Sequence, residues 1–543
     1  MSRSKHLPHL MTGILIVGFI AVSCTRDRNT PLLPAIETPS TTPIPVTPLP
    51  TFTPTPQGFS TPAVYGPDRE NLPSNINPLS GQEVKDPSLF GTPAVALSIS
   101  HFPVAARPQA GLSFAPWVFE FYITEGATRF LGMFYGEFPE PENPLIGDCS
   151  IRREPFVQTS LMLGNRIWLD ENQNGTQEDY ERGIGGICVD LLDASGNLLQ
   201  QTSSDSNGYY GFNVQPGEYI VEFKLPAGSK FTQKNIGDED KDSDADPDTG
   251  RAEAEVRSTL LYLDAGLIPS EETAPSSSDS QLPPAQVGPI RSGRLLYIDI
   301  HDMFINSCFI FASASPEILP MLPQCYLVPH DEASGGAMLP IEKMRSLAEE
   351  NRESRSGDFN YASNVFSETP PPGGLPANKV SSYVARLNQS AWVYDPLSAS
   401  YWRYVDDATA ENAGKLHAEI DLLTGRQLQF ENIVVLFVEQ EVFEYKHVPV
   451  PTLIDWKLEL GGGGYATLFR DGMKYDIRWS TKARAYEKQT ALARPIYFVD
   501  ADGNPVPLKP GQTWLFVATP YSYVTNQGDG SWVIRYVAPE GSK

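Results

Sequence analysis

The chain has 543 residues, of which 66 are Asp or Glu and 41 are Lys or Arg, so its formal net charge is −25. Nucleic-acid binding requires a basic surface that neutralises phosphates, and this charge balance argues against it. With 41% hydrophobic and 20% charged residues the chain is too apolar to be wholly disordered, and its length predicts about three domains.

The first 24 residues have the pattern of a signal peptide. Arg3 and Lys5 precede an apolar run from Leu10 to about Val22, which ends in small residues before Cys24. A cysteine at this position resembles the lipobox of bacterial lipoproteins, which implies cleavage before Cys24 and a diacylglycerol on its thiol. The alternative is simple secretion, with Cys24 an incidental thiol. Acyl chains contribute about 0.8 kcal/mol per buried CH₂, so a lipidated chain would stay on the membrane.

Residues 25–68 are predicted to form a stalk. Between Pro31 and Pro62 there are ten prolines and eight threonines, a composition that cannot bury a core and favours extended polyproline II. At about 3.1 Å per residue, this segment would hold the rest of the chain up to roughly 100 Å from the lipid. Signal and stalk together predict a cell-envelope protein, lipid-anchored on the outer face of the cytoplasmic membrane.

A first folded segment, residues 69–138, is interrupted and resumes at residues 286–372. Within it, Phe119, Phe121 and Ile123 alternate with more polar residues, which predicts a half-buried strand. After the resumption, an apolar face with helical spacing predicts a helix over residues 340–353. From residue 385 to residue 523, short strands with tight turns predict an antiparallel domain.

Motifs in both of these parts resemble the YerB-like lipoproteins, a bacterial family of unassigned function. The matching segments, in the family's order, are Ala106–Gly111, Glu125–Phe130, Gly288–Arg294, Trp392–Asp395, Phe469–Gly472 and Pro510–Trp514. The resemblance implies an N-terminal domain that is split and a C-terminal domain that follows it. Because the family has no assigned activity, the resemblance indicates architecture and location more than chemistry.

Seven polar residues within or near these motifs form a candidate ligand cleft. They are Arg107, Glu120, Glu125, Arg129, Arg291, Arg294 and Asn360. An arginine binds a carboxylate or phosphate through two parallel hydrogen bonds, so one interpretation is a cleft for an anion such as a cell-wall peptide carboxylate. The other is that Arg and Glu pair internally and hold the fold together. Phe311 and Phe359 replace histidines of the family pattern. If those histidines do chemistry in the relatives, this chain cannot repeat it. The alternative is that the histidines only pack, and that phenylalanine fills the same space.

The interrupting residues 160–268 resemble the SdrD B-like module, a relative of the Cna B-type repeats of bacterial surface proteins. The matching segments are Gly164–Leu169, Asp205–Tyr210, Pro216–Tyr219 and Asp264–Gly266. The resemblance implies a small prealbumin-like β-sandwich, and the strand-period alternation of Tyr219–Phe223 agrees with it. Residues 269–285 would link the module back to the interrupted domain.

Residues 170–181 of this module fit the calcium-loop pattern D-x-[DN]-x-[DN]-G-x₅-E at every constrained position. Calcium takes about six to eight oxygen ligands, and alternate side chains of a tight loop converge on one point. The predicted ligands are Asp170, Asn172, Asn174, the Thr176 carbonyl and Glu181. The alternative is an Asn-rich turn held by its own hydrogen bonds.

A second acidic run extends from residue 238 to residue 248. Its members Asp238, Asp240, Asp242 and Asp244 form a candidate second calcium cluster, and the alternative is a solvated acidic loop. The hypothesis is that Ca²⁺ is the cofactor of this module and stiffens it.

Besides Cys24 the chain has Cys149, Cys188, Cys308 and Cys325. Cys308 and Cys325 lie within one predicted domain and are the favoured disulfide, while Cys188 could pair with Cys149. Since no CxxC motif is present, a structural zinc site has no support.

The predicted fold class is α+β and multi-domain. It comprises an α/β N-terminal domain, a prealbumin-like β-sandwich inserted into it, and an antiparallel all-β C-terminal domain. The predicted function is a binding or scaffolding role at the cell surface. The expected partners are membrane lipid, through the acylated N-terminus, and cell-wall polymer or another surface protein. The alternative is a hydrolase or transferase that acts on cell-wall polymer through the Arg/Glu cleft. No nucleophile elbow or P-loop motif occurs, so enzyme activity is the less favoured class.

Overall fold

The computed structural model describes residues 64–142, 147–268, 282–329, 336–355, 357–445, 453–540 and 542. These residues belong to one compact unit, Ser60–Lys543. The predicted signal peptide, the predicted lipid attachment site Cys24, the stalk before residue 64 and residues 269–281 of the linker lie outside the described residues.

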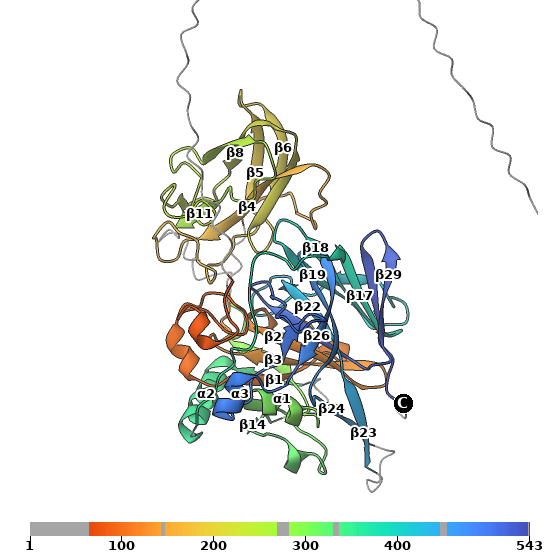
Figure 1. Cartoon of the computed structure of the whole chain (residues 1–543). Coiled ribbons are helices and arrows are strands. Elements are labelled where there is room, and N and C mark those ends of the chain that lie inside the picture. The colour runs from red at the N-terminus through yellow and green to blue at the C-terminus, as the bar shows by residue number, and fades with distance from the viewer. Residues whose placement is uncertain are drawn as a thin grey trace, which may run out of the picture. The chain divides into compact units, whose positions relative to one another are not determined.

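A sheet of thirteen strands forms the main body (Figure 1). In spatial order its strands are β14 (Tyr326–Leu327), β13 (Cys308–Phe311), β1 (Val95–Ser100), β3 (Ala127–Phe134), β2 (Trp117–Thr124), β28 (Thr513–Ala518), β22 (Asn432–Phe437), β25 (Gly464–Arg470), β26 (Met473–Ser480) and β16 (Leu375–Pro376), with β12 (Gln286–Ile290), β15 (Ala337–Pro340) and β27 (Tyr497–Val499) attached beside them. Strands of the two halves of the chain meet where β2 pairs in parallel with β28, with Phe119 opposite Leu515. The C-terminal half therefore does not form the separate antiparallel domain that the sequence predicts.

Strand β2 is buried on both faces, although its alternation predicts a half-buried strand. Seven of its eight residues are buried. Phe119 and Phe121 pack into one apolar core, and Val118 and Tyr122 pack into the core on the opposite face. The polar position Glu120 thus points into the protein interior, which requires a buried partner.

A second sheet of seven strands packs on this opposite face. Its strands are β20 (Leu416–Ala418), β19 (Ser400–Asp406), β18 (Asn388–Asp395), β17 (Lys379–Ala385), β30 (Ser531–Arg535) and β29 (Tyr523–Gly528), and β21 (Gln429–Phe430) pairs with β19. Val380 and Trp532 of this sheet share a core with Val118 and Trp514 of the thirteen-stranded sheet. A separate hairpin consists of β23 (Glu439–Tyr445) and β24 (Leu453–Glu459).

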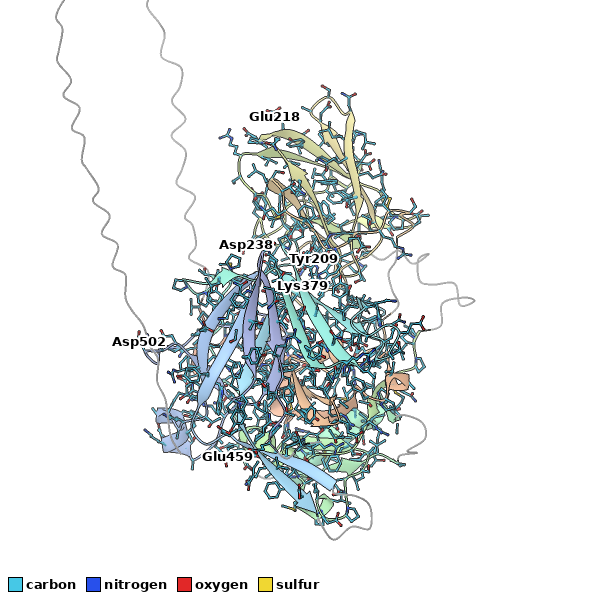
Figure 2. The ribbon with its side chains drawn as sticks, turned by 90° about the vertical axis from the view of Figure 1, so that its right-hand side faces the viewer. Tyr209, Glu218, Asp238, Lys379, Glu459 and Asp502 are labelled. Atoms are coloured by element: carbon cyan, nitrogen blue, oxygen red, sulfur yellow. A yellow bond between two sulfur atoms is a disulfide. The ribbon has the colours of Figure 1, made fainter. Side chains whose placement is uncertain are left out.

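The inserted segment between β3 and β12 folds around its own core (Figures 1 and 2). Its two sheets have four strands each. One is β10 (Arg251–Val256), β8 (Gly217–Phe223), β5 (Cys188–Asp193) and β6 (Leu198–Ser203), and the other is β7 (Tyr209–Val214), β4 (Leu161–Leu169), β11 (Ala265–Ile268) and β9 (Lys230–Phe231). Side chains from both sheets, among them Leu163 and Val221, fill the space between them.

The protein is mostly β, with 40% of residues in strands and 10% in helices, so the predicted α+β class and the α/β N-terminal domain are wrong. The described residues contain the α-helices α1 (Tyr297–Met303), α2 (Ile341–Ser354) and α3 (Ala485–Thr490) and the short 3₁₀ segments η1 (Arg69–Asn71), η2 (Pro87–Gly91), η3 (Val104–Ala106), η4 (Leu112–Phe114) and η5 (Leu319–Met321). None of the described helices is long and apolar enough to cross a membrane.

The composition of the connections explains the low helix content. The segment between β1 and β2 contains Pro103, Pro108 and Pro116, and it runs through the 3₁₀ turns η3 and η4 instead of a helix. Proline inside a helix removes a hydrogen bond and clashes with the preceding turn. Helix α2 is the exception, since its segment has apolar residues at helical spacing and no internal proline.

The two sheets of the body are joined by the buried guanidinium of Arg403, from β19. Its Nε lies 2.5 Å from Glu419 and its Nη2 3.7 Å from Glu120 of β2. Its Cζ lies 3.9 Å from the ring centroid of Trp514 and 4.7 Å from that of Trp392. The Trp514 Nε1–H also donates to Glu120, over 3.1 Å. Glu120 therefore has its buried partner, which comes from the other half of the chain.

We expect Arg403→Met to destabilise the body strongly. The substitution would leave Glu120 and Glu419 buried without a cation, which costs about 3–5 kcal/mol of unfolding free energy. Adding Glu419→Gln should recover part of this loss, because one of the two uncompensated charges is then gone. Urea denaturation measures both effects. Arg386→Met, at an exposed arginine, is the control and should change the unfolding free energy by less than about 0.5 kcal/mol. An equal loss in Arg403→Met and Arg386→Met would contradict the role of Arg403 in joining the two sheets.

Candidate functional site

The loop predicted to bind calcium lies between β4 and β5 of the inserted domain. Asp170 is buried at its centre and accepts hydrogen bonds from the Gly175 N–H (2.9 Å) and the Asn174 N–H (3.1 Å). Asn172 and Asn174 each accept the N–H of the residue two positions later. These are Asx-type turns, so the loop holds its own shape, and the loop connects strands and not helices.

Glu181 at the end of this loop is also buried, and it accepts the Glu171 N–H over 2.9 Å. Burial raises its pKa to about 7. The candidate ligand oxygens already accept loop N–H groups, but a carboxylate has several lone pairs and retains acceptor capacity. Among the described residues, no three His, Cys, Asp or Glu side chains are arranged to hold one metal ion. A calcium site here would therefore depend on the amide oxygens of Asn172 and Asn174 and on the Thr176 carbonyl.

The second acidic run is divided by its surroundings. Asp238 (labelled in Figure 2) and Asp240 are exposed, whereas Asp242 and Asp244 are buried. The run lies against the first loop, because Thr176 bridges to Asp242 and the Gln177 N–H donates to the Lys241 carbonyl. The structure does not gather the four candidate aspartates into one cluster.

This end of the inserted domain nevertheless buries an unusual amount of negative charge. The buried carboxylates are Asp170, Glu181, Asp242, Asp244 and Asp264. Within the described chain, none of the five forms an ion pair with a lysine or arginine. Burial raises the pKa of Asp244 to about 7, and Asp242 Oδ1 is buried without a hydrogen-bond partner. Burial without a cationic partner favours the neutral, protonated form of these carboxyl groups.

The inserted domain is fastened to the body by Arg153, in the segment that leads into it. One guanidinium nitrogen lies 2.5 Å from Asp205 of the insertion, and the other lies 2.5 Å from Asp395 at the end of β18. All three side chains are buried, and the guanidinium stacks on Trp402 at 5.2 Å. The lead-in is also linked to β5 by the Cys149–Cys188 disulfide, while a Cys308–Cys325 disulfide lies in the body.

Other contacts bring the insertion close to the body. A Cβ at Gly211 of β7 would lie 2.5 Å from a terminal methyl of Leu397, so a larger residue there would displace the Leu397 side chain. The loop of residues 170–181 also contacts the body, because Glu171 pairs with Lys85 at 2.9 Å and Asp179 accepts the Glu83 N–H at 3.0 Å. The insertion is thus a docked domain and not a freely hanging arm.

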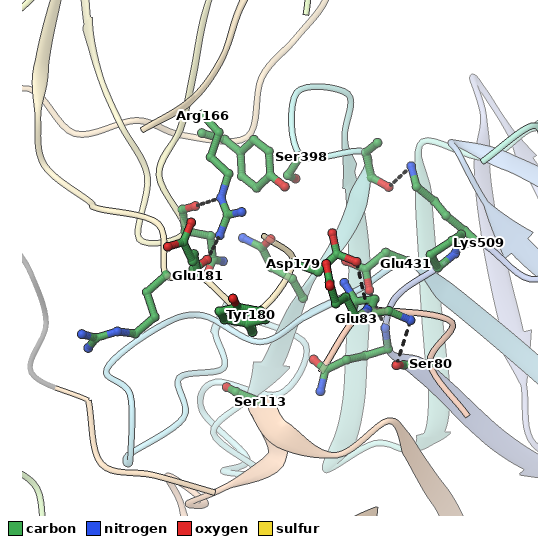
Figure 3. A pocket seen from close by; sticks show the side chains of 18 of the residues that line it. Ser80, Glu83, Ser113, Arg166, Asp179, Tyr180, Glu181, Ser398, Glu431 and Lys509 are labelled. Carbon is green, nitrogen blue, oxygen red and sulfur yellow. Dashed lines mark hydrogen bonds between the residues drawn. The ribbon is translucent and has the colours of Figure 1, made fainter. Parts of the chain in front are cut away.

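A cavity of about 540 Å³ lies at this junction (Figure 3). Residues of the insertion and of both halves of the body line it, and acidic side chains outnumber basic ones. The acidic residues are Glu83, Glu137, Glu142, Asp179, Glu181, Glu368 and Glu431, and the basic ones are Arg166, Arg182, Arg426 and Lys509. Burial raises the pKa of Glu137 and of Glu431 to about 7. The lining disfavours an anionic ligand.

Three of the predicted cleft arginines gather on the face of the large sheet opposite Arg403. Arg129 of β3 is buried, donates to the Ser292 carbonyl over 3.3 Å, and has no hydrogen-bond partner for its Nε. Burial, helped by the nearby charges of Arg294 and Arg291, lowers the pKa of Arg129 to about 9. Arg129 makes no ion pair with a carboxylate in the described part of the chain. The cluster is therefore basic and lacks the glutamates predicted to share it.

The strand register explains why the glutamates are elsewhere. Glu120 pairs with Phe130 across β2 and β3, so its side chain lies on the face opposite that of Arg129. Glu125 is exposed in the turn between these strands, in a left-handed conformation. Arg107 donates to the carbonyls of His101 and Asp406. The predicted Arg/Glu cleft is thus not formed as one group.

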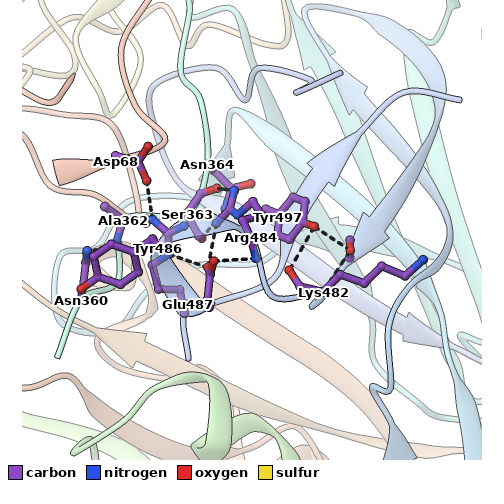
Figure 4. A network of polar contacts seen from close by, with 12 residues as sticks. Asp68, Asn360, Ala362, Ser363, Asn364, Lys482, Arg484, Tyr486, Glu487 and Tyr497 are labelled. Atoms are coloured by element: carbon purple, nitrogen blue, oxygen red, sulfur yellow. Dashed lines mark hydrogen bonds and ion pairs between the residues drawn. The ribbon is translucent and has the colours of Figure 1, made fainter. Parts of the chain in front are cut away.

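Asn360 is also remote from the arginines and makes a turn by accepting the Ala362 N–H over 2.8 Å. It lies beside a polar network around Arg494 (Figure 4). Arg494 pairs with Asp68 at 2.7 Å and with Glu487 of α3 at 2.6 Å. Burial opposes the shift, but the hydrogen bond from Arg494 and the charge of Arg484 hold the pKa of Glu487 at about 2. The network fastens the start of the described chain to α3.

Sequence reasoning missed Arg153 and Arg403, whose ion pairs join segments far apart in the sequence. Arg403 had a signal, because it occupies an inward position between Tyr401 and Val405 of an alternating strand. Arg153 lies in an irregular lead-in, where no periodic pattern marks it.

Comparison with known families agrees with this arrangement. The N-terminal domain of the protein of unknown function DUF3048 matches residues 79–203, and its C-terminal domain matches residues 380–515. The SdrD B-like domain matches residues 161–267. The chain carries both DUF3048 domains, with an SdrD B-like domain inserted between them.

The similar curated proteins match only short stretches of the chain. A fibrinogen-binding protein of Staphylococcus epidermidis is 44% identical over 88 residues, 16% of this chain and 8% of the relative. Serine-aspartate repeat-containing protein C of Staphylococcus aureus is 42% identical over 84 residues, 15% of this chain and 9% of the relative. The chain thus spans less than a tenth of the length of these relatives. The YerB protein of Bacillus subtilis has a similar solved structure, with 15% identity and a TM-score of 0.41 over 82% of this chain and 96% of that one.

We expect Arg153→Ala to loosen the SdrD B-like domain from the DUF3048 domains. The variant leaves Asp205 and Asp395 buried without a cation, and the unfolding free energy should fall by about 3–5 kcal/mol in urea denaturation. Hydrogen exchange at the Phe156 N–H, which donates to Asp395, should become faster. The neighbouring exposed Arg152 provides the control, and Arg152→Ala should leave both measurements unchanged. Equal effects of the two variants would mean that Arg153 does not fasten the domain.

Proposed function

We propose that this DUF3048 protein is lipid-anchored in the cell envelope and has a binding or scaffolding role at the cell surface, with an SdrD B-like domain that calcium stabilises. The signal-peptide pattern, Cys24 and the Pro/Thr-rich stalk support the location. The relatives of the inserted domain are serine-aspartate repeat proteins and a protein named for binding fibrinogen, which supports the binding class but does not identify the ligand.

The observation that carries the calcium proposal is the set of buried carboxylates without lysine or arginine partners. Burying a charge is costly unless it is paired or coordinates a metal. Asp170, Asn172, Asn174, the Thr176 carbonyl and Glu181 would hold the ion, which would supply the missing positive charge. Because Glu171 and Asp179 of the same loop contact the body, stiffening this loop would also support the docked position of the domain.

The alternative, a hydrolase or transferase acting on cell-wall polymer, has less support. It requires carboxylates beside the cleft arginines, yet Glu120 lies on the other face of the sheet with Arg403, and Glu125 is exposed in a turn. The arginine cluster around Arg129 remains a candidate for holding a carboxylate or phosphate group. Binding is therefore the function class that we retain.

Calcium should raise the melting temperature of the chain, and EGTA should reverse the increase. At a calcium concentration of about 100 times the dissociation constant, the gain in unfolding free energy would be about 2.7 kcal/mol. Glu181→Gln keeps the side-chain shape but removes a charged ligand, so it should abolish most of the calcium-dependent increase in scanning calorimetry. Asp238→Asn, at an exposed position, should retain the increase. Identical melting of the unaltered chain in calcium and in EGTA would refute calcium stabilisation.

Replacing Cys24 should release the chain from membranes. In cells that process lipoproteins, the unaltered chain should sediment with the membrane fraction, because acyl chains on the Cys24 thiol bury in lipid. Cys24→Ser removes the acceptor thiol, and the chain should then appear in the soluble fraction. Cell fractionation with immunodetection measures this distribution, and Cys308→Ser/Cys325→Ser, which removes a body disulfide, should stay with the membrane. Membrane retention of Cys24→Ser would show that the anchor lies elsewhere.

A further inference from the structure

A groove of about 660 Å³ lies in the C-terminal part of the body, away from the junction cavity and the arginine cluster. It is formed by the ends of β25 and β26, by the start of β29 and by the base of the β23–β24 hairpin. The residues used below are Glu439, Glu459, Tyr465, Lys474, Asp476, Arg478 and Tyr523. Its volume falls within the range of small-molecule binding sites, about 300–1,000 Å³.

Two tyrosines expose their rings at this groove. Tyr465 of β25 is 66% exposed and Tyr523 of β29 is 51% exposed, although most aromatic side chains of the body are buried. Arg478 lies opposite Tyr465 in the strand register, and its guanidinium stacks on that ring at 4.7 Å. A tyrosine combines an apolar ring with a polar hydroxyl, and aromatic surface left in water beside a groove is typical of a binding site.

Three carboxylates supply hydrogen-bond acceptors to the groove. Glu439 and Glu459 face each other across the β23–β24 hairpin, and both are exposed. Glu459 is labelled in Figure 2. Like charges directly opposite each other destabilise a strand pair, so the fold gains nothing from this arrangement. Asp476 contributes a third carboxylate, which Lys474 contacts at 2.5 Å.

This combination fits a sugar better than an anion or a plain hydrophobic ligand. A pyranose ring has an apolar C–H face that stacks on an aromatic ring, and hydroxyl groups at its edge that donate to carboxylates. Of the two cations of the groove, Lys474 is neutralised by Asp476, and Arg478 lies with its guanidinium over the ring of Tyr465. With three carboxylates and a chain charge of −25, a polyanion would be repelled.

We propose that this groove binds a neutral oligosaccharide. The rings of Tyr465 and Tyr523 stack on sugar rings, and Glu439, Glu459 and Asp476 accept hydrogen bonds from sugar hydroxyls. The proposal specifies a ligand for the binding role proposed above and rests on that role, but it depends on neither calcium nor the lipid anchor.

The test is a calorimetric titration of the mature chain carrying Cys24→Ser, in EGTA, with two neutral probes: N-acetylglucosamine hexamer and cellohexaose. We expect saturable binding of at least one probe. Tyr465→Ala/Tyr523→Ala should weaken this binding about tenfold or more, because both stacking surfaces are lost. Tyr521→Ala is the matched control, because Tyr521 is 67% exposed and precedes Tyr523 by two residues but does not line the groove. Melting curves of the variants establish that each is folded.

The absence of saturable binding to both probes would overturn the proposal, as would undiminished binding in the double variant or equal weakening in Tyr521→Ala. Preference for a polyanion such as polyglutamate over both sugars would also overturn it. Because EGTA and Cys24→Ser remove the calcium and anchor contributions, failure of the titration leaves those parts of the proposed function standing. Conversely, failure of the anchor or calcium experiments does not affect a positive titration.

Discussion

The buried guanidinium of Arg403 is the constraint on which the two-sheet body depends. A cation in the interior must be neutralised and must have its faces covered, and no single segment does both. Glu120 and Trp514 come from the large sheet, whereas Glu419 and Trp392 come from the second sheet or the segment beside it. Without the second sheet, Glu120 would be buried without a cation, and without the large sheet the Arg403 guanidinium would lose the ring of Trp514. The body is therefore one folding unit even though its two family domains are far apart in sequence.

The inserted domain is attached by the same kind of interaction. Arg153 is buried between Asp205 of the insertion and Asp395 of the body, so the two must approach closely for either carboxylate to be neutralised. A domain inserted without such contacts would sample many positions relative to the body. The buried ion pairs and the packing of Leu397 against Gly211 hold it against the body. The inserted surface module thereby belongs to the same compact unit as the body.

How far the sequence predicts the protein depends on whether a feature is local. The calcium-loop geometry follows from residues 170–181, because Asx turns and a glycine turn are set by neighbours. Helix α2 follows from its own periodicity. The fold class of the N-terminal domain could not be predicted from the sequence. Both helices and proline-rich 3₁₀ turns can connect strands, and the periodicity of a strand does not show which other strand it pairs with. The Arg/Glu cleft failed for a related reason: Glu120 and Arg129 are close in sequence, but the register of β2 and β3 places them on opposite faces. Only knowledge of the second sheet would have revealed Arg403 as the partner of Glu120.

The junction cavity and the groove lined by Tyr465 and Tyr523 are formed by different parts of the chain. The junction cavity needs the inserted domain and both halves of the body, and acidic side chains outnumber basic ones in its lining. All residues that line the groove of Tyr465 and Tyr523 lie between Phe437 and Val524, so the inserted domain does not contribute to it. A binding function located in the groove would therefore belong to the DUF3048 body itself. The SdrD B-like domain would then add a second surface, held in a fixed position by Arg153, to a body that already binds its own ligand.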